Sequence, residues 1–488
     1  MRRRVTTLLL PALLSLLPAS LRAADFQSGQ AARAVIGQPS FSAREPGIAA
    51  TTLSLSNGKL YAADTAHRLL TFDLSKIPGA KDDLFDRQAP CSLCGFPAVE
   101  QVNQAVLPGV AGVAMFGNAV AMVDTPNHRV LFWPDAATQH PAQLVLGSSD
   151  LVEPVSVALD GKRLYVGDAG SHRVLIWNAL PSSDNQPADA VLGIYSELPG
   201  ADTINSPDAL VSDGGNLFVA DSLDRRILVF TAGDIALARN AVVNSASLSA
   251  GALAPGTLVT VTGTGFTEAP ASATDDGVQR LPAKLGGVEV LFDGVALPLL
   301  SVSPTQVRAQ LPYDTGGAAG GSLYLRTEHS DGSVTVTNAT ALRLASTSPG
   351  LFAFGGTEPR TGLILHSSGS PEQAGTPVTA DDPARAGELL IFWAAGLGAV
   401  DTGSEKGPLI GVPYAGPDAP VASRVGAVVS GRTAQVVSAT LPERSIGVYE
   451  VRIVLPSDLP TDSNTELLIM QDGNLSNTVT IPVRNTIQ

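Results

Sequence analysis

The sequence has few of the residues on which several classes of protein depend. It contains only two cysteines among 488 residues, so a disulfide framework cannot hold the fold together. After the N-terminal segment, no apolar run approaches the ~18 residues that a transmembrane helix needs. Basic residues are outnumbered, with 31 Lys and Arg against 45 Asp and Glu, which gives a formal net charge of −14. This charge disfavours nucleic acid and anionic membrane surfaces as partners.

Sequence motifs of common catalytic and cofactor sites are also missing. The chain has no G-x-S-x-G nucleophile elbow, no H-E-x-x-H zinc motif and no phosphate-binding Walker loop. Adjacent aspartates at 275–276 and 381–382 lack the spaced oxygen ligands of a calcium loop, so we expect them to be solvated. We therefore assign no catalytic, cofactor-binding or metal-binding residue. A Ser/His/Asp triad stays open as an alternative, because its members need not be adjacent in the sequence.

The first 23 residues have the composition of a secretory signal peptide. Arg2, Arg3 and Arg4 form a positive start, residues 8–17 form a short apolar run, and the small residue Ala23 follows. The run is too short to span a bilayer, so we expect cleavage near Ala23. The mature protein is then exported, and lies outside the cell, in the periplasm or at the cell surface. An uncleaved membrane anchor is the alternative.

The two cysteines, Cys91 and Cys94, are separated by two residues. In an exported protein they can oxidise to a small local disulfide. Gly95 stands where a haem-attachment motif would have histidine, and a zinc site would need two more ligands. We predict a local disulfide or a free pair without a catalytic role.

Four similar segments repeat in the first half of the chain. They span residues 59–72, 119–133, 163–177 and 216–230, and each contains two apolar strands joined by a short turn that begins at an aspartate. The turn is followed by His-Arg in three copies and by Arg-Arg in the fourth. We expect these residues to fix the turns, because Asp accepts backbone N–H bonds and Arg reaches a neighbouring carbonyl or carboxylate. The predicted turn residues are Asp64, His67, Arg68, Asp124, His128, Arg129, Asp168, His172, Arg173, Asp221, Arg225 and Arg226.

Further apolar strands precede and follow these segments, so the repeating unit is a four-stranded antiparallel sheet. The pattern resembles that of NHL-repeat β-propellers, and the resemblance covers residues 24–236. The fourth copy lacks a following strand, and Ala32–Gly37 near the N-terminus would supply it. Lys81–Phe85 would be the outer strand of the first sheet. Four blades are therefore preferred, with five as the alternative, although NHL propellers usually have six.

The second half reads as two tandem Ig-like β-sandwiches, over residues 240–346 and 347–488. Its glycines recur in register, with Gly256 and Gly265 matching Gly387 and Gly396. The first copy resembles IPT/TIG domains in the segments 253–266 and 303–312. The pair together resembles an uncharacterised C-terminal module of secreted acidobacterial proteins, which implies export and names no activity. The predicted fold is thus all-β, a small β-propeller followed by two sandwiches.

These features favour a secreted, non-enzymatic binding or adhesion protein. Its partner would be a protein or a glycan, bound at the propeller face that carries the aspartate turns and two long crossings, Asp86–Leu107 and Ile194–Ser206. The sandwiches would act as spacer or docking modules. The alternative is a metal-dependent propeller lyase or hydrolase acting on an extracellular substrate, which would need ligands converging on the propeller axis.

Overall fold

The protein is described by a computed structural model over residues 24–38, 40–44, 47–56, 58–65, 69–74, 100–102, 112–135, 144–147, 150–274, 278–367, 374–403 and 407–485. Apart from short 3₁₀ turns, regular structure in these ranges is β-strand, so the predicted all-β class is confirmed. None of the helical turns described is long and apolar enough to cross a membrane. The predicted signal peptide, residues 1–23, lies outside the described residues.

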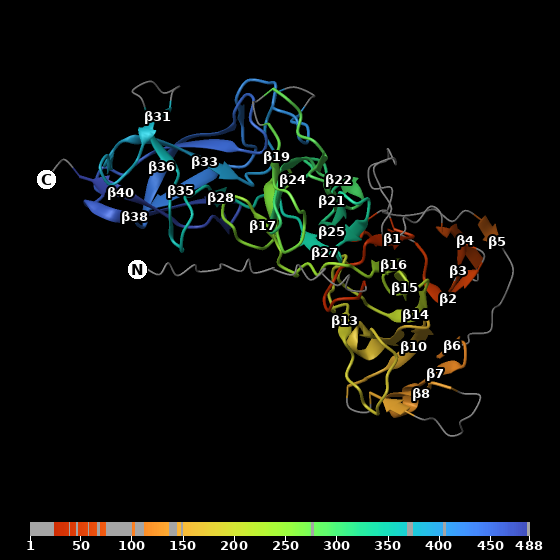
Figure 1. The fold of residues 1–488 in the computed structure, drawn as a ribbon. Coiled ribbons are helices and arrows are strands. Elements are labelled where there is room, and N and C mark those ends of the chain that lie inside the picture. Colours follow the sequence, from red (N-terminus) through yellow and green to blue (C-terminus); the bar gives the residue numbers. More distant parts are fainter. Residues whose placement is uncertain are drawn as a thin grey trace, which may run out of the picture.

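The first part of the chain forms four separate four-stranded antiparallel sheets. In Figure 1 they are grouped so that their first strands, β2, β6, β10 and β14, lie toward the middle of the group. Contacts between sheets run from β6 to β10, from β10 to β14 and from β14 to β2. The strands are β2 (Ala50–Ser56), β3 (Lys59–Asp64), β4 (Leu69–Asp73), β5 (Glu100–Val102); β6 (Val113–Phe116), β7 (Ala119–Asp124), β8 (Arg129–Trp133), β9 (Leu144–Leu146); β10 (Pro154–Leu159), β11 (Leu164–Asp168), β12 (Arg173–Trp177), β13 (Ala190–Leu192); and β14 (Pro207–Ser212), β15 (Asn216–Asp221), β16 (Arg226–Thr231), β1 (Ala34–Ile36).

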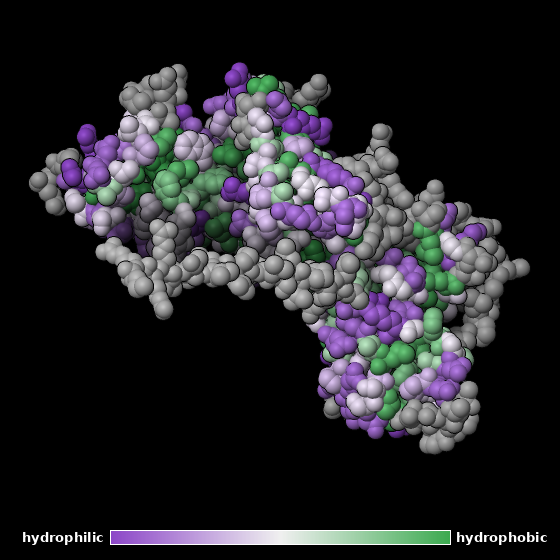
Figure 2. All heavy atoms as spheres, in the orientation of Figure 1, coloured by the Kyte–Doolittle hydropathy of each residue, from purple (hydrophilic) through white to green (hydrophobic). Residues whose placement is uncertain are grey.

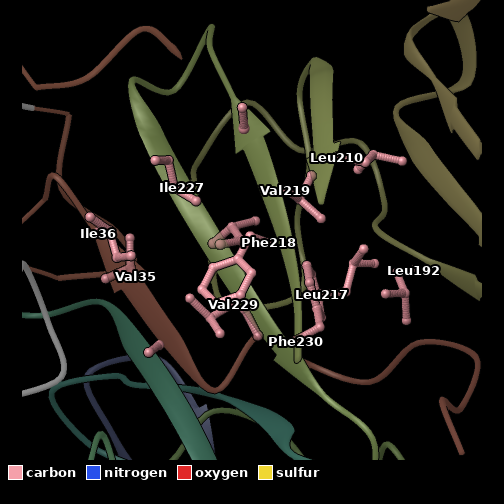
Figure 3. Packing of buried hydrophobic residues seen from close by; sticks show 14 of the residues in the cluster. Val35, Ile36, Leu192, Leu210, Leu217, Phe218, Val219, Ile227, Val229 and Phe230 are labelled. Atoms are coloured by element: carbon pink, nitrogen blue, oxygen red, sulfur yellow. The ribbon is translucent and has the colours of Figure 1, made fainter. Parts of the chain in front are cut away.

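The fourth sheet takes its outer strand from the start of the chain. Strand β1 pairs antiparallel with β16, with Val35 opposite Leu228 and Ile36 opposite Ile227. This is the position that the sequence predicts for the Ala32–Gly37 segment. Figure 3 shows Val35 and Ile36 beside the side chains of β16, and both are fully buried. The fourth sheet is therefore completed by two strands, β1 and β16, that lie almost 200 residues apart in the sequence.

The outer strand of the first sheet differs from the prediction. The strand that pairs with β4 is β5, with Val102 opposite Leu69, rather than Lys81–Phe85. Lys81–Phe85 lies outside the described residues. The prediction was wrong because a three-residue strand has almost no alternation of its own, so its neighbours and not its sequence select it.

Three of the four sheets share a core with the first sandwich. Buried side chains of the first, third and fourth sheets form one cluster with Leu291, Tyr324 and Ala339 of the sandwich. Those of the second sheet form a separate cluster with other side chains of the third. Arg33, just before β1, donates a hydrogen bond from Nη2 to the Tyr324 hydroxyl at 3.0 Å. The backbone N–H of Ala31 donates to the carbonyl of Ala339 at 3.0 Å. The N-terminal segment thus lies between the sheets and the sandwich.

The first sandwich has two sheets facing one apolar core. Its core comes from alternating buried positions on both sheets, as in Ig-like folds. One sheet contains β17 (Val242–Asn244), β18 (Leu258–Thr262), β24 (Gln306–Gln310), β23 (Leu299–Val302) and β19 (Ala271–Ser272); the other contains β20 (Lys284–Leu285), β21 (Val288–Phe292), β22 (Val295–Ala296), β25 (Gly320–Glu328), β26 (Val334–Val336) and β27 (Thr340–Arg343).

The second sandwich is one connected set of 13 strands around its own core. The long β36 pairs with β35 over its first residues and with β37 over the rest, with a bulge between Val436 and Ser438. This strand therefore belongs to both layers. The strands are β28 (Gly350–Leu351), β29 (Arg360–Thr361), β30 (Ile364–Ser367), β31 (Ala374–Pro377), β32 (Ala384–Arg385), β33 (Leu389–Ala395), β34 (Ala419–Pro420), β35 (Val425–Val429), β36 (Arg432–Leu441), β37 (Tyr449–Val454), β38 (Asp462–Gln471), β39 (Asn474–Leu475) and β40 (Val479–Arg484).

Corresponding turns of the two sandwiches have the same backbone geometry. Asp293 and Gly294 have φ of 48° and 77°, and Ser430 and Gly431 have φ of 47° and 75°. Two successive positive φ values define a type I′ hairpin, which favours glycine at its second position. Gly294 and Gly431 thus occupy equivalent turns.

Removing β1 should destabilise the four-sheet part of the protein. A variant lacking residues 1–36 loses the backbone partner of β16 and uncovers its apolar side chains, whereas a control lacking only residues 1–23 keeps both. We expect a lower Tm and faster amide hydrogen exchange in β16 for the longer deletion. Equal exchange rates in β16 for the two proteins would show that β1 does not protect that edge.

The carboxyl group of Asp293 should make stability depend on pH. Burial raises the pKa of Asp293 to about 7, opposed by the hydrogen bond that it accepts from the Ser322 backbone N–H. The folded state therefore holds a proton that the unfolded state releases near pH 4, so stability falls as pH rises from about 4 through 7. At about 1.4 kcal/mol per pKa unit, the loss is on the order of a few kcal/mol.

Asp293→Asn should abolish this loss, because asparagine also suits a type I′ turn. Asp472→Asn, in an exposed hairpin with similar φ values, is the matched control. Denaturant unfolding at pH 5 and pH 8 measures the effect. Identical pH profiles for the wild type and Asp293→Asn would contradict it.

Candidate binding surface at the turn end of the sheets

The repeated aspartates lie at the end of the second strand in each sheet. In the third sheet, Oδ1 of Asp168 accepts the backbone N–H groups of Val152 and Glu153, at 3.1 and 2.8 Å. In the fourth, Oδ1 of Asp221 accepts those of Asn205 and Ser206, both at 2.9 Å. Each carboxylate therefore fixes the start of the first strand in its own sheet. We call this end of the sheets the turn end.

The repeated arginines hold the other carboxylate oxygen. Nε of Arg129, Arg173 and Arg226 donates to Oδ2 of Asp124, Asp168 and Asp221 at 2.7, 3.2 and 2.9 Å. The side chains become more buried along the series, from the half-exposed pair in the second sheet to the fully buried pair in the fourth. The hydrogen bond from Arg129 lowers the pKa of Asp124. Burial raises the pKa of Asp221, and the Arg226 guanidinium opposes that effect.

The residue that ends each turn connects its sheet to the next one. His128, His172 and Arg225 all have positive φ, from 53° to 54°. Nδ1 of His128 donates to the carbonyl of Val152 at 2.5 Å, and Nδ1 of His172 donates to that of Asn205 at 2.7 Å. The carbonyl of Arg225 accepts the N–H of Ile48, which precedes β2, at 3.0 Å. The last turn residue thus binds the next sheet each time, through its ring in the second and third sheets and through its backbone carbonyl in the fourth.

The first copy of the turn is described only in part. Asp64 ends β3, and its backbone pairs with Ala50. His67, Arg68, Cys91 and Cys94 lie outside the described residues.

The predicted Asp86–Leu107 crossing does not lie wholly at the turn end. Strand β5 lies within Asp86–Leu107, and its first residue, Glu100, pairs with Thr71 in the middle of β4. Because β4 runs away from the turn end, the antiparallel β5 runs back toward that end and reaches Leu69 at Val102. Residues 74–99, with both cysteines, therefore precede the outer strand, and only residues after Val102 follow it. The prediction that the whole insertion belongs to the turn end was wrong because it placed the outer strand too early.

Large apolar side chains are exposed at the turn end. Val152, Tyr195, Leu198 and Leu223 are 53%, 59%, 75% and 69% exposed. Tyr195 and Leu198 belong to the Ile194–Ser206 crossing, and Leu223 belongs to the fourth turn. We call these four residues the turn surface. Figure 2 shows hydrophobic residues among hydrophilic ones on the visible face of the four sheets.

Neighbouring contacts hold this surface in place. A Cβ on Gly170, in the third turn, would lie 2.7 Å from Cγ1 of Val152, so glycine lets that side chain lie against the turn. The rings of His172 and Tyr195 are 4.6 Å apart between centroids and tilted by 39°. The sequence carried one signal for this surface. Leu223, a large apolar residue, stands at the turn position where the other described turns have Pro126 and Gly170.

A separate cleft of about 270 Å³ lies between the two sandwiches. Side chains already bind the backbone across the junction. Nδ2 of Asn244 donates to the Ser348 carbonyl at 2.8 Å. Nη2 of Arg360, in the second sandwich, donates to the carbonyls of Ala246 and Ser247 in the first, both at 2.9 Å. These contacts fix one sandwich against the other. Elsewhere among the described residues, no three His, Cys, Asp or Glu side chains are grouped so as to hold a metal ion.

Residues 241–354 match the IPT/TIG domain. This range contains the whole first sandwich and the first strand of the second, so the Ig-like character expected for this part is confirmed. None of the curated proteins matches the chain.

Several solved structures show limited similarity. The computationally designed Ika4 protein has 14% identity and a TM-score of 0.18, over 40% of this chain and 96% of its own. SGBP-B of the Bacteroides ovatus mixed-linkage glucan utilization locus, in complex with a mixed-linkage heptasaccharide, has 10% identity and a TM-score of 0.21, over 48% and 45%. The fibronectin(III)-like modules of Clostridium thermocellum CbhA have 14% identity and a TM-score of 0.14, over 50% and 94%. TM-scores this low establish neither a shared domain arrangement nor a shared ligand.

The buried aspartate in the third sheet should matter more than the exposed one in the second. Asp168→Asn leaves Arg173 without its ionic partner and weakens two backbone hydrogen bonds, so we expect a loss of about 2–4 kcal/mol in unfolding free energy. Asp124→Asn breaks a more exposed pair and should cost clearly less. Denaturant unfolding of both variants at pH 7 measures the difference. Equal losses would show that burial of the turn does not govern its contribution.

Proposed function

We propose that the protein is an exported, non-enzymatic binding or adhesion protein that contacts its partner through the turn surface. The four sheets act in this proposal as the blades of a small four-bladed propeller, the NHL-like architecture expected from the sequence. The observation that carries the proposal is the exposure of Val152, Tyr195, Leu198 and Leu223 at one end of these sheets. Exposed apolar groups on a rigid scaffold are typical of interaction sites.

The turns beneath this surface support a binding role because they are held from several directions. Asp168 and Asp221 are fully buried and bind backbone groups on the strand that follows each crossing. The crossing itself starts beside His172 and ends at Asn205, which that histidine binds. A partner therefore meets a surface whose backbone is already ordered, and less conformational entropy is lost on binding.

The two sandwiches would serve as spacer or docking modules. They contact each other through Asn244 and Arg360, and the first packs against the N-terminal segment and the fourth sheet. The IPT/TIG match covers the first sandwich and brings no catalytic residue into the proposal. Export rests on the predicted signal peptide, and the ligand of this proposal is a protein or a glycan.

Replacing two exposed leucines should remove binding without unfolding the protein. We expect the double variant Leu198→Ser/Leu223→Ser to keep its Tm within about 1 °C, since surface substitutions usually cost less than about 0.5 kcal/mol. Binding to ligands selected from a displayed peptide library or an oligosaccharide array should fall at least about tenfold. Leu409→Ser, an exposed leucine in the second sandwich, is the matched control. If that control loses binding and the double variant keeps it, the sandwich is the recognition unit.

A further inference from the structure

The turn surface carries negative charge beside its apolar side chains. Glu153 directly follows Val152, Glu197 directly precedes Leu198, and both glutamates are exposed. In the part of the chain that the structure describes, neither carboxylate takes part in an ion pair or a side-chain hydrogen bond. The other acidic groups of the turns are engaged, since Asp168 and Asp221 bind arginines. This leaves two free carboxylates within the surface.

The apolar members of the surface fit a protein better than a glycan. Three of the four are aliphatic, and branched aliphatic groups lack the flat face on which a sugar ring stacks. Tyr195 is the single aromatic ring among them, and His172 already lies against it. Aliphatic groups surrounded by polar ones are instead typical of protein–protein contacts. An anionic lipid surface is disfavoured as well, because it would repel both carboxylates.

We propose that the turn surface binds a protein segment that presents Lys or Arg side chains beside aliphatic ones. This inference rests on the proposed function, because it names the partner of the same surface. Aliphatic side chains of the segment would cover Leu198 and Val152, and its cations would face Glu197 and Glu153. Arg225 is exposed in the fourth turn, so the acidic character belongs to the part of the surface formed by the third turn and the Ile194–Ser206 crossing. The net charge of −14 would add long-range attraction for such a segment.

The test begins with selection of phage-displayed random peptides on the full-length protein, alongside an oligosaccharide array. We expect the enriched peptides to combine net positive charge with Leu, Val or Ile. Glu153→Gln/Glu197→Gln should weaken their binding by about 3- to 10-fold at about 50 mM salt, mainly through slower association. The difference should shrink at about 0.5 M salt, because salt screens exposed charges. Glu443→Gln/Glu466→Gln changes the net charge equally on the second sandwich and should leave binding nearly unchanged.

Several outcomes would overturn the inference. Enriched peptides without net positive charge would remove the acidic contact as its basis. Oligosaccharide binding that Tyr195→Ala abolishes, without any peptide binding, would identify a glycan site. An equal loss in the control double variant would show attraction to the whole molecule. If Leu198→Ser/Leu223→Ser abolishes binding and Glu153→Gln/Glu197→Gln does not, the turn surface is the binding site and only the basic partner is wrong. If neither double variant changes binding, both proposals are refuted.

Discussion

Strand β1 gives the outer edge of β16 a backbone partner, and the residues just before it bind the first sandwich. Without that strand, β16 would present unpaired backbone groups and uncovered apolar side chains. Ala31 and Arg33, three and one residues earlier, bind Ala339 and Tyr324. A single extended segment thus completes the fourth sheet and fixes the sheets against the sandwich, so both interfaces depend on the N-terminus being in place.

The turn end depends on a different kind of contact, a buried charge satisfied from several sides. Asp221 is fully buried, and it is held by one arginine and two backbone N–H groups. Burying a carboxylate is costly unless such partners are present, which explains why the aspartate and arginine recur together. The histidines add a bond to the next sheet. Order at this end therefore comes from polar contacts, which leaves the apolar side chains of the crossing free to face solvent.

This division of roles accounts for the position of the candidate surface. The apolar core lies between the sheets and against the sandwich, whereas Tyr195, Leu198 and Leu223 stand on backbone that the aspartates hold. They can be replaced without opening the core. The sandwiches are fixed to each other by the Asn244 and Arg360 side chains, which bind backbone carbonyls across the junction.

Local sequence pattern was enough to predict the all-β class, the repeated turns at Asp124, Asp168 and Asp221, and the pairing of the N-terminal strand. The class and the turns depend on alternation and on turn chemistry, which neighbouring residues determine, whereas the N-terminal strand was predicted because the fourth repeat lacks an outer strand of its own. The tertiary structure alone decided that Glu100–Val102 is the outer strand of the first sheet, because so short a strand is chosen by its partner. It alone placed Arg33 on Tyr324, 291 residues away, and left Leu198 and Leu223 uncovered. Exposure depends on what the rest of the chain covers, and no local pattern records that.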